Sequence, residues 1–261
     1  MPLLARVVLV ILLAVQAAPA TAELTFVWED RFSAAERAKL TDWVRETHDA
    51  VERLVGPFPM GVRAHLHRRD GAREPVPWAN TQRYGGQGVH LHVDPSYPLA
   101  AFRGDWTAPH ELSHLVLPYL GRRNAWFSEG FASYLQYPVM QAMGVLSREQ
   151  AEQRYRRNLV RAARRYDYPH QPFVEAAPKL RADRQYPVMY WGGAAYFMQV
   201  DEALETSGSS LLEVLREYVA CCRRNRAGLP ALLSELDRLA PSPVFSEHYQ
   251  RFTTKPGFPE F

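Results

Sequence analysis

The chain has 261 residues, of which 47% are hydrophobic, and a formal net charge of +3. This length and composition allow one well-buried core of ordinary domain size. The 31 basic residues are nearly balanced by 28 acidic ones, so the charge gives no indication of nucleic-acid binding. No nucleic-acid partner is therefore expected.

The first 22 residues have the order of parts found in a secretory signal. Arg6 precedes an apolar run at 7–15, and small residues ending in A-T-A at 20–22 follow it. A short membrane anchor is the alternative, but the run is well below the roughly 20 residues that a span needs. We predict a cleaved signal peptide at residues 1–22, a periplasmic or secreted location, and no transmembrane segment after cleavage.

Cysteine occurs only as the adjacent pair Cys221 and Cys222. Export would place both in oxidising conditions. Neighbouring Cα atoms lie about 3.8 Å apart, however, which is closer than a disulfide prefers. We therefore expect no disulfide framework, and we expect two helix residues of which at least one is buried. Reversible bridging, or pairing between molecules, is the alternative.

Hydrophobic patterning predicts a small β-containing N-lobe at about residues 23–106. Ser33 and Glu36 form a capping-box pattern that begins a helix ending near residue 55. Strands are predicted at 24–28, 62–67 and 89–93.

From residue 107 onward the pattern is helical and predicts a C-lobe at about residues 107–261. Thr107 is a plausible N-cap, and Pro109 fits a first turn. Helices are expected at about 109–119, 128–141, 147–166, 188–206, 209–225 and 228–239, with a short helix in the tail from residue 241. The fold class is therefore α+β, with one domain in two lobes over residues 23–261.

The segment H-E-L-S-H at 110–114 carries the strongest chemical signal. Residues i and i+4 of a helix lie one above the other, about 5–6 Å apart at Cβ. His110 and His114 can therefore reach one zinc ion at distances of about 2.0–2.1 Å. Glu111 lies one residue round the turn, where a carboxylate can take a proton from the zinc-bound water. A helix with two surface histidines is the alternative.

A second segment, W-F-S-E-G-F-A-S-Y at 126–134, resembles a segment of the gluzincin metallopeptidases. The aminopeptidase N-like, glycyl-aminopeptidase-like and peptidase MA-like families share versions of it. The resemblance implies a thermolysin-like catalytic domain with one Zn²⁺ per chain, in which Glu129 is the third ligand beside His110 and His114, and Glu111 is the general base. The 14 residues between His114 and Glu129 form a shorter connection than in aminopeptidase N-like enzymes.

A third segment, M-Y-W-G-G-A-A at 189–195, is similar to the Y-x-K-G-A helix start of the same families. Their tyrosine stabilises the oxyanion of the tetrahedral intermediate, and removing such a donor costs on the order of 10²-fold in rate. The resemblance implies this role for Tyr190. Gly192 stands where lysine is usual. Tyr186 and Tyr196 are competing candidates, and an aromatic core position is the alternative.

The motif that binds a substrate's free amino group in aminopeptidase N-like enzymes is not recognisable here. Those enzymes carry a G-x-M-E-N strand before the zinc helix. We match that strand to residues 88–94, which contain no corresponding glutamate. An exopeptidase assignment therefore lacks its main support, although the strand can still pair with an extended peptide.

Three further patterns each allow two interpretations. The H-x-H pairs at 65–67 and 90–92 each lie on one face of a strand. They are expected to line the floor of the site or be exposed, rather than bind a second metal. The arginine-rich helix at 148–165 is expected to be a solvated face, with contact to an anionic partner as the alternative. Ser133 is expected to pack as a small residue, with a hydrogen bond to a zinc histidine as the alternative.

Together these patterns predict an exported zinc metallopeptidase, a hydrolase that cleaves a peptide or protein substrate. Glu111 is its general base and Tyr190 its oxyanion donor. A zinc-binding, non-catalytic envelope protein and an amidase acting on a cell-wall amide are the alternatives. The sequence indicates neither the side-chain specificity, nor a choice between end trimming and internal cleavage, nor the oligomeric state.

Overall fold

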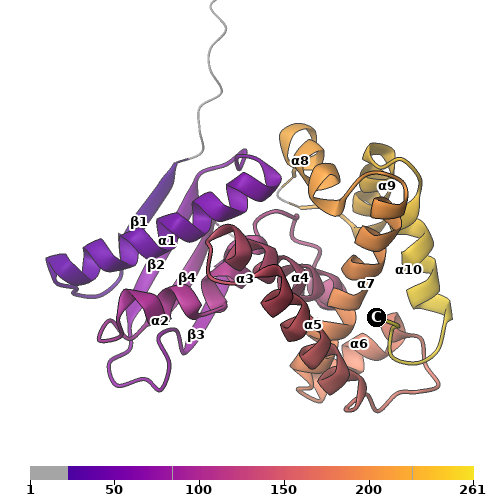
Figure 1. The fold of residues 1–261 in the computed structure, drawn as a ribbon, viewed down its shortest axis with the longest axis horizontal. Helices are drawn as coiled ribbons and strands as arrows, with labels where there is room; N and C mark the ends of the chain where they lie inside the picture. Colours follow the sequence, from indigo (N-terminus) through magenta and orange to yellow (C-terminus); the bar gives the residue numbers. More distant parts are fainter. Residues whose placement is uncertain (1–22, 84, 225) are drawn as a thin grey trace, which may run out of the picture.

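The computed structural model describes residues 23–261 except Tyr84 and Asn225. The predicted signal peptide, residues 1–22, lies outside this part of the chain. None of the described helices is long and apolar enough to cross a membrane. Figure 1 shows the strands and the first helix at one end of the molecule and the later helices at the other.

A four-stranded mixed sheet occupies the N-terminal end, in the order β1-β2-β4-β3. Strands β1, β2 and β4 are parallel, and β3 is antiparallel to β4. The strands are β1 (Leu24–Trp28), β2 (Val62–Arg68), β3 (Trp78–Gln82) and β4 (Gln87–Val93). The three predicted strands are confirmed. The unpredicted strand is β3, whose W-A-N-T-Q sequence lacks the apolar alternation of a half-buried strand.

The position of β4 corrects the expectation that this strand can pair with an extended peptide. Both of its edges are occupied, one by β2 and the other by β3. Gly88 lies so close to β2 that an added Cβ would be 2.3 Å from the Arg63 carbonyl oxygen. The edge nearest the later helices belongs to β3, which contacts the helix that carries His110.

Helix α1 (Ala34–Val55) packs on the sheet and begins at the predicted capping box. The Ser33 amide donates to Glu36 Oε2 at 2.7 Å, and the Glu36 amide donates to Ser33 Oγ at 3.3 Å. Arg68 of β2 also donates to Glu36 Oε1 at 3.0 Å. These contacts, led by the Arg68 hydrogen bond, lower the pKa of Glu36 to about 2. The cap therefore also joins the helix to the sheet.

The later helices confirm the α+β class. Their bounds are α2 (Leu99–Gly104), α3 (Thr107–Ser113), α4 (Ala125–Ala142), α5 (Arg148–Ala163), α6 (Phe173–Ala182), α7 (Tyr186–Thr206), α8 (Leu211–Cys221), α9 (Leu229–Leu239) and α10 (Val244–Thr254). Helices α2 and α6 were not predicted. The first has only six residues, and the second contains Pro178, a residue type that opposes helix interiors.

Helices α4 and α7 approach so closely that their backbones touch. A Cβ added to Gly193 would lie 2.1 Å from the Trp126 carbonyl oxygen, and one added to Gly130 would lie 2.3 Å from the Gly193 carbonyl carbon. Glycine is required at both positions because no side chain fits between the helices. This crossing holds Glu129 and Tyr190 on facing helices, one to three residues from the contact.

Cys221 and Cys222 form a disulfide with each other, with Cα atoms 3.7 Å apart. Cys221 is exposed and Cys222 is half-buried. The expectation of an unbridged pair with one buried member is therefore wrong. The pair lies where α8 ends, and Cys222, with φ −135°, has left the helical conformation. A bridge between neighbours ties no distant segments together, so it supplies no disulfide framework.

Candidate metal centre

His110 lies on α3 and His114 caps its C-terminus, and this helix begins and ends earlier than expected. Thr107 is the first helical residue and not the N-cap, a position that Trp106 takes without a side-chain bond. Asp105 Oδ1 instead accepts the Thr107 amide at 2.7 Å. An acid two residues upstream therefore satisfies the first amide, which makes a hydroxyl cap at Thr107 unnecessary.

Two half-buried arginines hold the chain where α3 ends. Arg83 donates to the carbonyl oxygens of His114 at 2.5 Å and Leu117 at 3.3 Å. Arg223 donates twice to the carbonyl oxygen of Leu115, at 2.8 and 3.0 Å. Burial lowers the pKa of each guanidinium to about 10. The helix does not continue to residue 119 as predicted, because Pro118 has no N–H for the His114 carbonyl and opposes a helix interior. The arginines satisfy the carbonyl oxygens that are left there.

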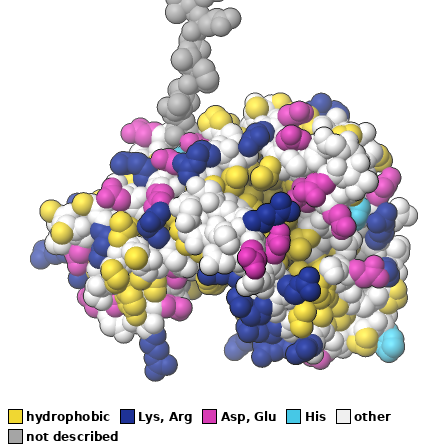
Figure 2. Space-filling view, in the orientation of Figure 1, with side chains coloured by type: hydrophobic (Ala, Val, Ile, Leu, Met, Phe, Trp, Pro, Cys, Tyr) yellow, Lys and Arg dark blue, Asp and Glu magenta, His cyan; other side chains and the backbone are white. Residues whose placement is uncertain are grey.

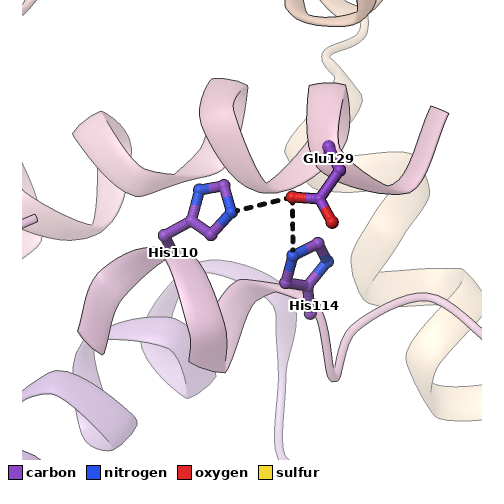
Figure 3. A group of neighbouring side chains, drawn as sticks. All are labelled: His110, His114 and Glu129. Atoms are coloured by element: carbon purple, nitrogen blue, oxygen red, sulfur yellow. Dashed lines mark hydrogen bonds and ion pairs between the residues drawn. The ribbon is translucent and has the colours of Figure 1, made fainter. Parts of the chain in front are cut away.

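His110, His114 and Glu129 converge as the sequence predicts (Figure 3). Glu129 Oε2 lies 3.2 Å from His110 Nε2 and 3.4 Å from His114 Nε2. A tetrahedral zinc ion with bonds of about 2.0–2.1 Å separates its ligand atoms by about 3.3 Å. The three side chains therefore have the donor set and the spacing that one zinc ion requires. Both histidines are buried, and Glu129 is half-buried.

The electrostatics of the three groups also suit a cation. Burial alone would raise the pKa of the Glu129 carboxyl, but the charges and hydrogen bonds of His114 and His110 hold it well below its usual range. For His110, burial opposes protonation, while Glu129 raises the pKa above its ordinary value. Both effects favour a negative charge on Glu129 beside the two imidazoles, as the binding of a cation requires.

Gln136 fixes the orientation of His110 from α4. Its Oε1 lies 3.0 Å from His110 Nδ1, and both side chains are buried. An Nδ1–H that bonds to Gln136 leaves Nε2 free to bind the metal. Ser133 does not take this role, in agreement with the expectation that it packs as a small residue. Gln136 was not predicted from the sequence. It lies two helical turns after Glu129, and no recognised motif includes a glutamine at that position.

Glu111 faces the same cavity as the three ligands, a space of about 540 Å³. Thr81 of β3 donates to Glu111 Oε2 at 2.7 Å, and its Oγ1 also lies 3.0 Å from the Glu111 carbonyl oxygen. The edge strand therefore positions the residue predicted to be the general base. Thr81 was not singled out in the sequence because β3 itself was not recognised.

Tyr190 is the tyrosine of its helix that reaches the metal cavity. It lines that cavity, and its ring lies 6.0 Å from the His110 ring. Burial and then the carboxylates of Glu129 and Glu111 raise its pKa above the ordinary value, so the hydroxyl keeps its proton. The competitors lie elsewhere: Tyr196 is buried and donates to the Phe245 carbonyl oxygen, and Tyr186 is largely exposed.

Gly192 stands where the related families have lysine, and the packing of α6 explains this difference. A Cβ there would lie 2.2 Å from the Phe173 ring of α6. Phe173 is buried and occupies the volume that a side chain at 192 would need. The lysine of the related families therefore has no room here, and the backbone of α7 still presents Tyr190 to the metal centre.

Comparison with known proteins gives the fold a name. No protein family and no curated protein matches the sequence. A two-domain M1 zinc metallopeptidase variant bound to L-arginine matches with a TM-score of 0.55 and 16% identity, over 90% of this chain and 49% of that one. An M1 zinc metallopeptidase from Deinococcus radiodurans matches with a TM-score of 0.53 and 17% identity, over 90% and 49%. A variant from the same organism bound to a Tyr-Ser-Ala substrate gives 0.52 and 18%, over 89% and 49%.

The fold is that of the catalytic domain of M1 zinc metallopeptidases. The predicted gluzincin fold is thereby confirmed. The chain spans about half the length of the M1 structures that it matches. At these identities the likeness concerns the fold alone, so the roles of individual residues depend on the geometry described above.

In this M1 fold the strand beside the metal centre is β3, and it carries no acid. Its residues Trp78, Ala79, Asn80 and Thr81 line the metal cavity. The match of the amino-binding strand to residues 88–94 is therefore wrong, because that segment lies inside the sheet. Like residues 88–94, β3 contains no glutamate that could bind a substrate's free amino group.

The two H-x-H pairs form a stacked ladder across β2 and β4. The ring centroids of His65 and His90 lie 4.3 Å apart, as do those of His67 and His92, and His67 Nε2 lies 2.9 Å from His90 Nδ1. They do not line the metal cavity, and their side chains are buried or half-buried, so the expectation that they line the floor of the site or are exposed is wrong. Their strand positions alternate with the buried Leu66 and Leu91, so the ladder lies on the opposite face of the sheet from the core.

Proposed function

We propose that the chain is a zinc-dependent peptidase in which His110, His114 and Glu129 hold one zinc ion. The observation that carries this proposal is the convergence of three donor atoms at the spacing of a tetrahedral site, with Glu111 and Tyr190 on the same cavity. When bound there, zinc lowers the pKa of a water molecule and polarises the scissile carbonyl.

The protein groups supply the proton transfers and the stabilisation of charge. Glu111, held by Thr81, takes the proton of the attacking water and passes it to the leaving amine. The Tyr190 hydroxyl, kept protonated by burial and by two nearby carboxylates, donates a hydrogen bond to the developing oxyanion. Gln136 keeps His110 in the tautomer that binds the metal.

The edge of β3 is the place where we expect the substrate backbone to lie. An extended peptide can add as a further strand there, and Asn80 and Thr81 bring this edge to the metal cavity. A Tyr-Ser-Ala substrate is bound by one of the M1 proteins with this fold. We also propose, on the pattern of residues 1–22, that the protein acts in the periplasm or outside the cell.

The variant Glu111→Gln tests this proposal most sharply. It should retain one zinc per chain and lose peptide hydrolysis by about 10²-fold or more, because the proton acceptor is gone. Cleavage of a mixed peptide library, read by mass spectrometry, measures the loss. Glu74→Gln is the matched control, since Glu74 lines the same cavity but forms no hydrogen bond or ion pair with the three ligands.

Two outcomes would reject the proposal. One is undiminished hydrolysis by Glu111→Gln. The other is a zinc-loaded wild-type protein that cleaves no peptide of the library. Digestion of purified cell-wall sacculi in parallel would then separate an amidase from a non-catalytic zinc protein.

A further inference from the structure

A second cavity adjoins the metal centre on the far side of Tyr190. It has a volume of about 300 Å³ and shares Trp106 and Tyr190 with the metal cavity. Its lining is mainly aromatic or aliphatic; α4 and α7 contribute Tyr137, Tyr186, Pro187, Val188, Tyr190 and Trp191, together with the polar Ser133 and Gln136. A concave apolar space of this kind accepts a bulky apolar group.

The outer wall of this cavity is basic. Arg161 and Arg165 line the cavity and also line a surface groove along α5. We call the arginines of that groove the arginine face: Arg156, Arg157, Arg161, Arg164 and Arg165. Figure 2 shows dark blue side chains gathered where Figure 1 places α5. The cavity and the arginine face are therefore continuous.

The arginine face is electrostatically unbalanced. In the part of the chain that the structure describes, the guanidinium groups of its five members make no hydrogen bond and no ion pair. Two arginines elsewhere show the contrast: Arg148, on the same helix, binds Glu152 at 2.9 Å, and Arg103 binds Glu46 at 2.6 Å. Clustered like charges repel one another, and an anionic partner relieves that repulsion.

We propose that the cavity and the arginine face together select an acidic peptide as substrate. One bulky apolar side chain enters the cavity beside Tyr190, and carboxylates farther along the same peptide pair with Arg161 and Arg165. The order follows from the lining, because a chain that leaves the metal centre meets Tyr190 first, the cavity next and the arginines last. This inference rests on the proposed peptidase function.

An anionic membrane is the less suitable partner for these arginines. Two of the five belong to the wall of a concave cavity that joins the metal centre, and a lipid surface cannot enter it. An extended peptide can occupy the cavity and reach the arginine face at the same time. Guanidinium groups also bind carboxylates through paired, directional hydrogen bonds.

Binding to the zinc-loaded Glu111→Gln protein tests the inference without depending on turnover. The probes are two dye-labelled peptides, each with one Phe and three Glu residues. The Glu residues precede the Phe in one peptide and follow it in the other. Each has a matched control peptide with Gln in place of Glu. Fluorescence anisotropy should show tighter binding of one Glu peptide than of its Gln counterpart. Adding Arg161→Gln or Arg165→Gln should weaken it roughly two- to fivefold each.

The control is Arg148→Gln, the same change on the same helix at a residue that is paired with Glu152. It should leave the binding of both peptides unchanged. Equal binding of Glu and Gln peptides, or an equal loss in the Arg148 variant, would overturn the inference. So would arginine-dependent binding to phosphatidylglycerol vesicles that the acidic peptides fail to displace, since that result assigns the face to a membrane.

Wild-type turnover separates this inference from the peptidase proposal. Cleavage of Glu and Gln peptides with equal kcat/KM would leave the peptidase function standing and reject the acidic preference. Selective binding of the Glu peptide without any cleavage would reject the peptidase function and leave the preference for acidic peptides standing. If both hold, Arg161→Gln and Arg165→Gln raise KM for the Glu peptide and leave kcat unchanged, because neither residue lines the metal cavity.

Discussion

The metal centre is built differently on its helical side and on its sheet side. Helices α3, α4 and α7 pack through close contacts, down to the backbone contact of Gly130 with Gly193. The sheet reaches the centre through one edge strand, where Thr81 bonds Glu111. The helical side therefore fixes ligand positions, while the sheet side orients the base and offers an edge to a substrate.

The largest effect should come from the helix contact itself. Gly193→Ala places a Cβ 2.1 Å from the Trp126 carbonyl oxygen, so α4 and α7 must separate. We expect a loss of about 3 kcal/mol or more in the free energy of unfolding, measured by denaturant titration. Gly104→Ala, where nothing lies within 4 Å of the added Cβ, should cost far less. Equal stability of the two variants would show that the contact does not matter.

The next effect concerns Tyr190, which the same helix contact positions. Tyr190→Phe should lower kcat by on the order of 10²-fold while zinc content stays the same, because it removes only the oxyanion donor. Tyr186→Phe is the matched change one turn earlier on α7, outside the metal cavity. Steady-state kinetics on one peptide decides the matter. A similar loss in both variants would remove Tyr190 from its proposed role.

A smaller effect should follow from loss of the His110 contact. Gln136→Met deletes the hydrogen bond to His110 Nδ1 and keeps the volume of the side chain. We expect zinc affinity to fall by roughly 10- to 100-fold. Competition with a fluorescent chelator measures it. Gln141→Met, on the same helix but away from the ligands, should bind zinc like the wild type, and no difference between the variants would contradict the assignment.

On the sheet side, His92 of β4 should contribute to the pH dependence of stability. Burial lowers the pKa of His92 to about 4, whereas an unfolded histidine titrates near pH 6.5. Between these values the folded state binds fewer protons than the unfolded state, so the free energy of unfolding falls as pH drops from about 6.5 towards 4. His92→Gln should remove about 1 kcal/mol of this fall.

Chemical denaturation at pH 7 and pH 4.5 measures this pH effect. His170→Gln, which changes an exposed histidine, is the control and should keep the wild-type dependence. An unaltered pH dependence in His92→Gln would show that the ladder does not titrate as its burial indicates.

The contrast between the helical side and the sheet side also explains which site residues could be predicted from the sequence. His110, Glu111 and His114 could be assigned because a short motif at helical spacing brings them together, and Glu129 because its segment resembles that of the gluzincin metallopeptidases. Strand order could not be predicted, since β3 pairs with β4 through backbone bonds that leave no trace in W-A-N-T-Q. Arg83 and Arg223 were equally hidden, because each acts on α3 from a distant part of the chain.

The stoichiometry of bound zinc tests the central claim most directly. Metal analysis by mass spectrometry on purified, folded protein should give one zinc per chain for the wild type and for Glu111→Gln. His114→Ala and Glu129→Ala should bind none at the same zinc concentration, with circular dichroism confirming that both remain folded. Full zinc occupancy in either folded variant, or none in the wild type, would contradict the metal centre described here.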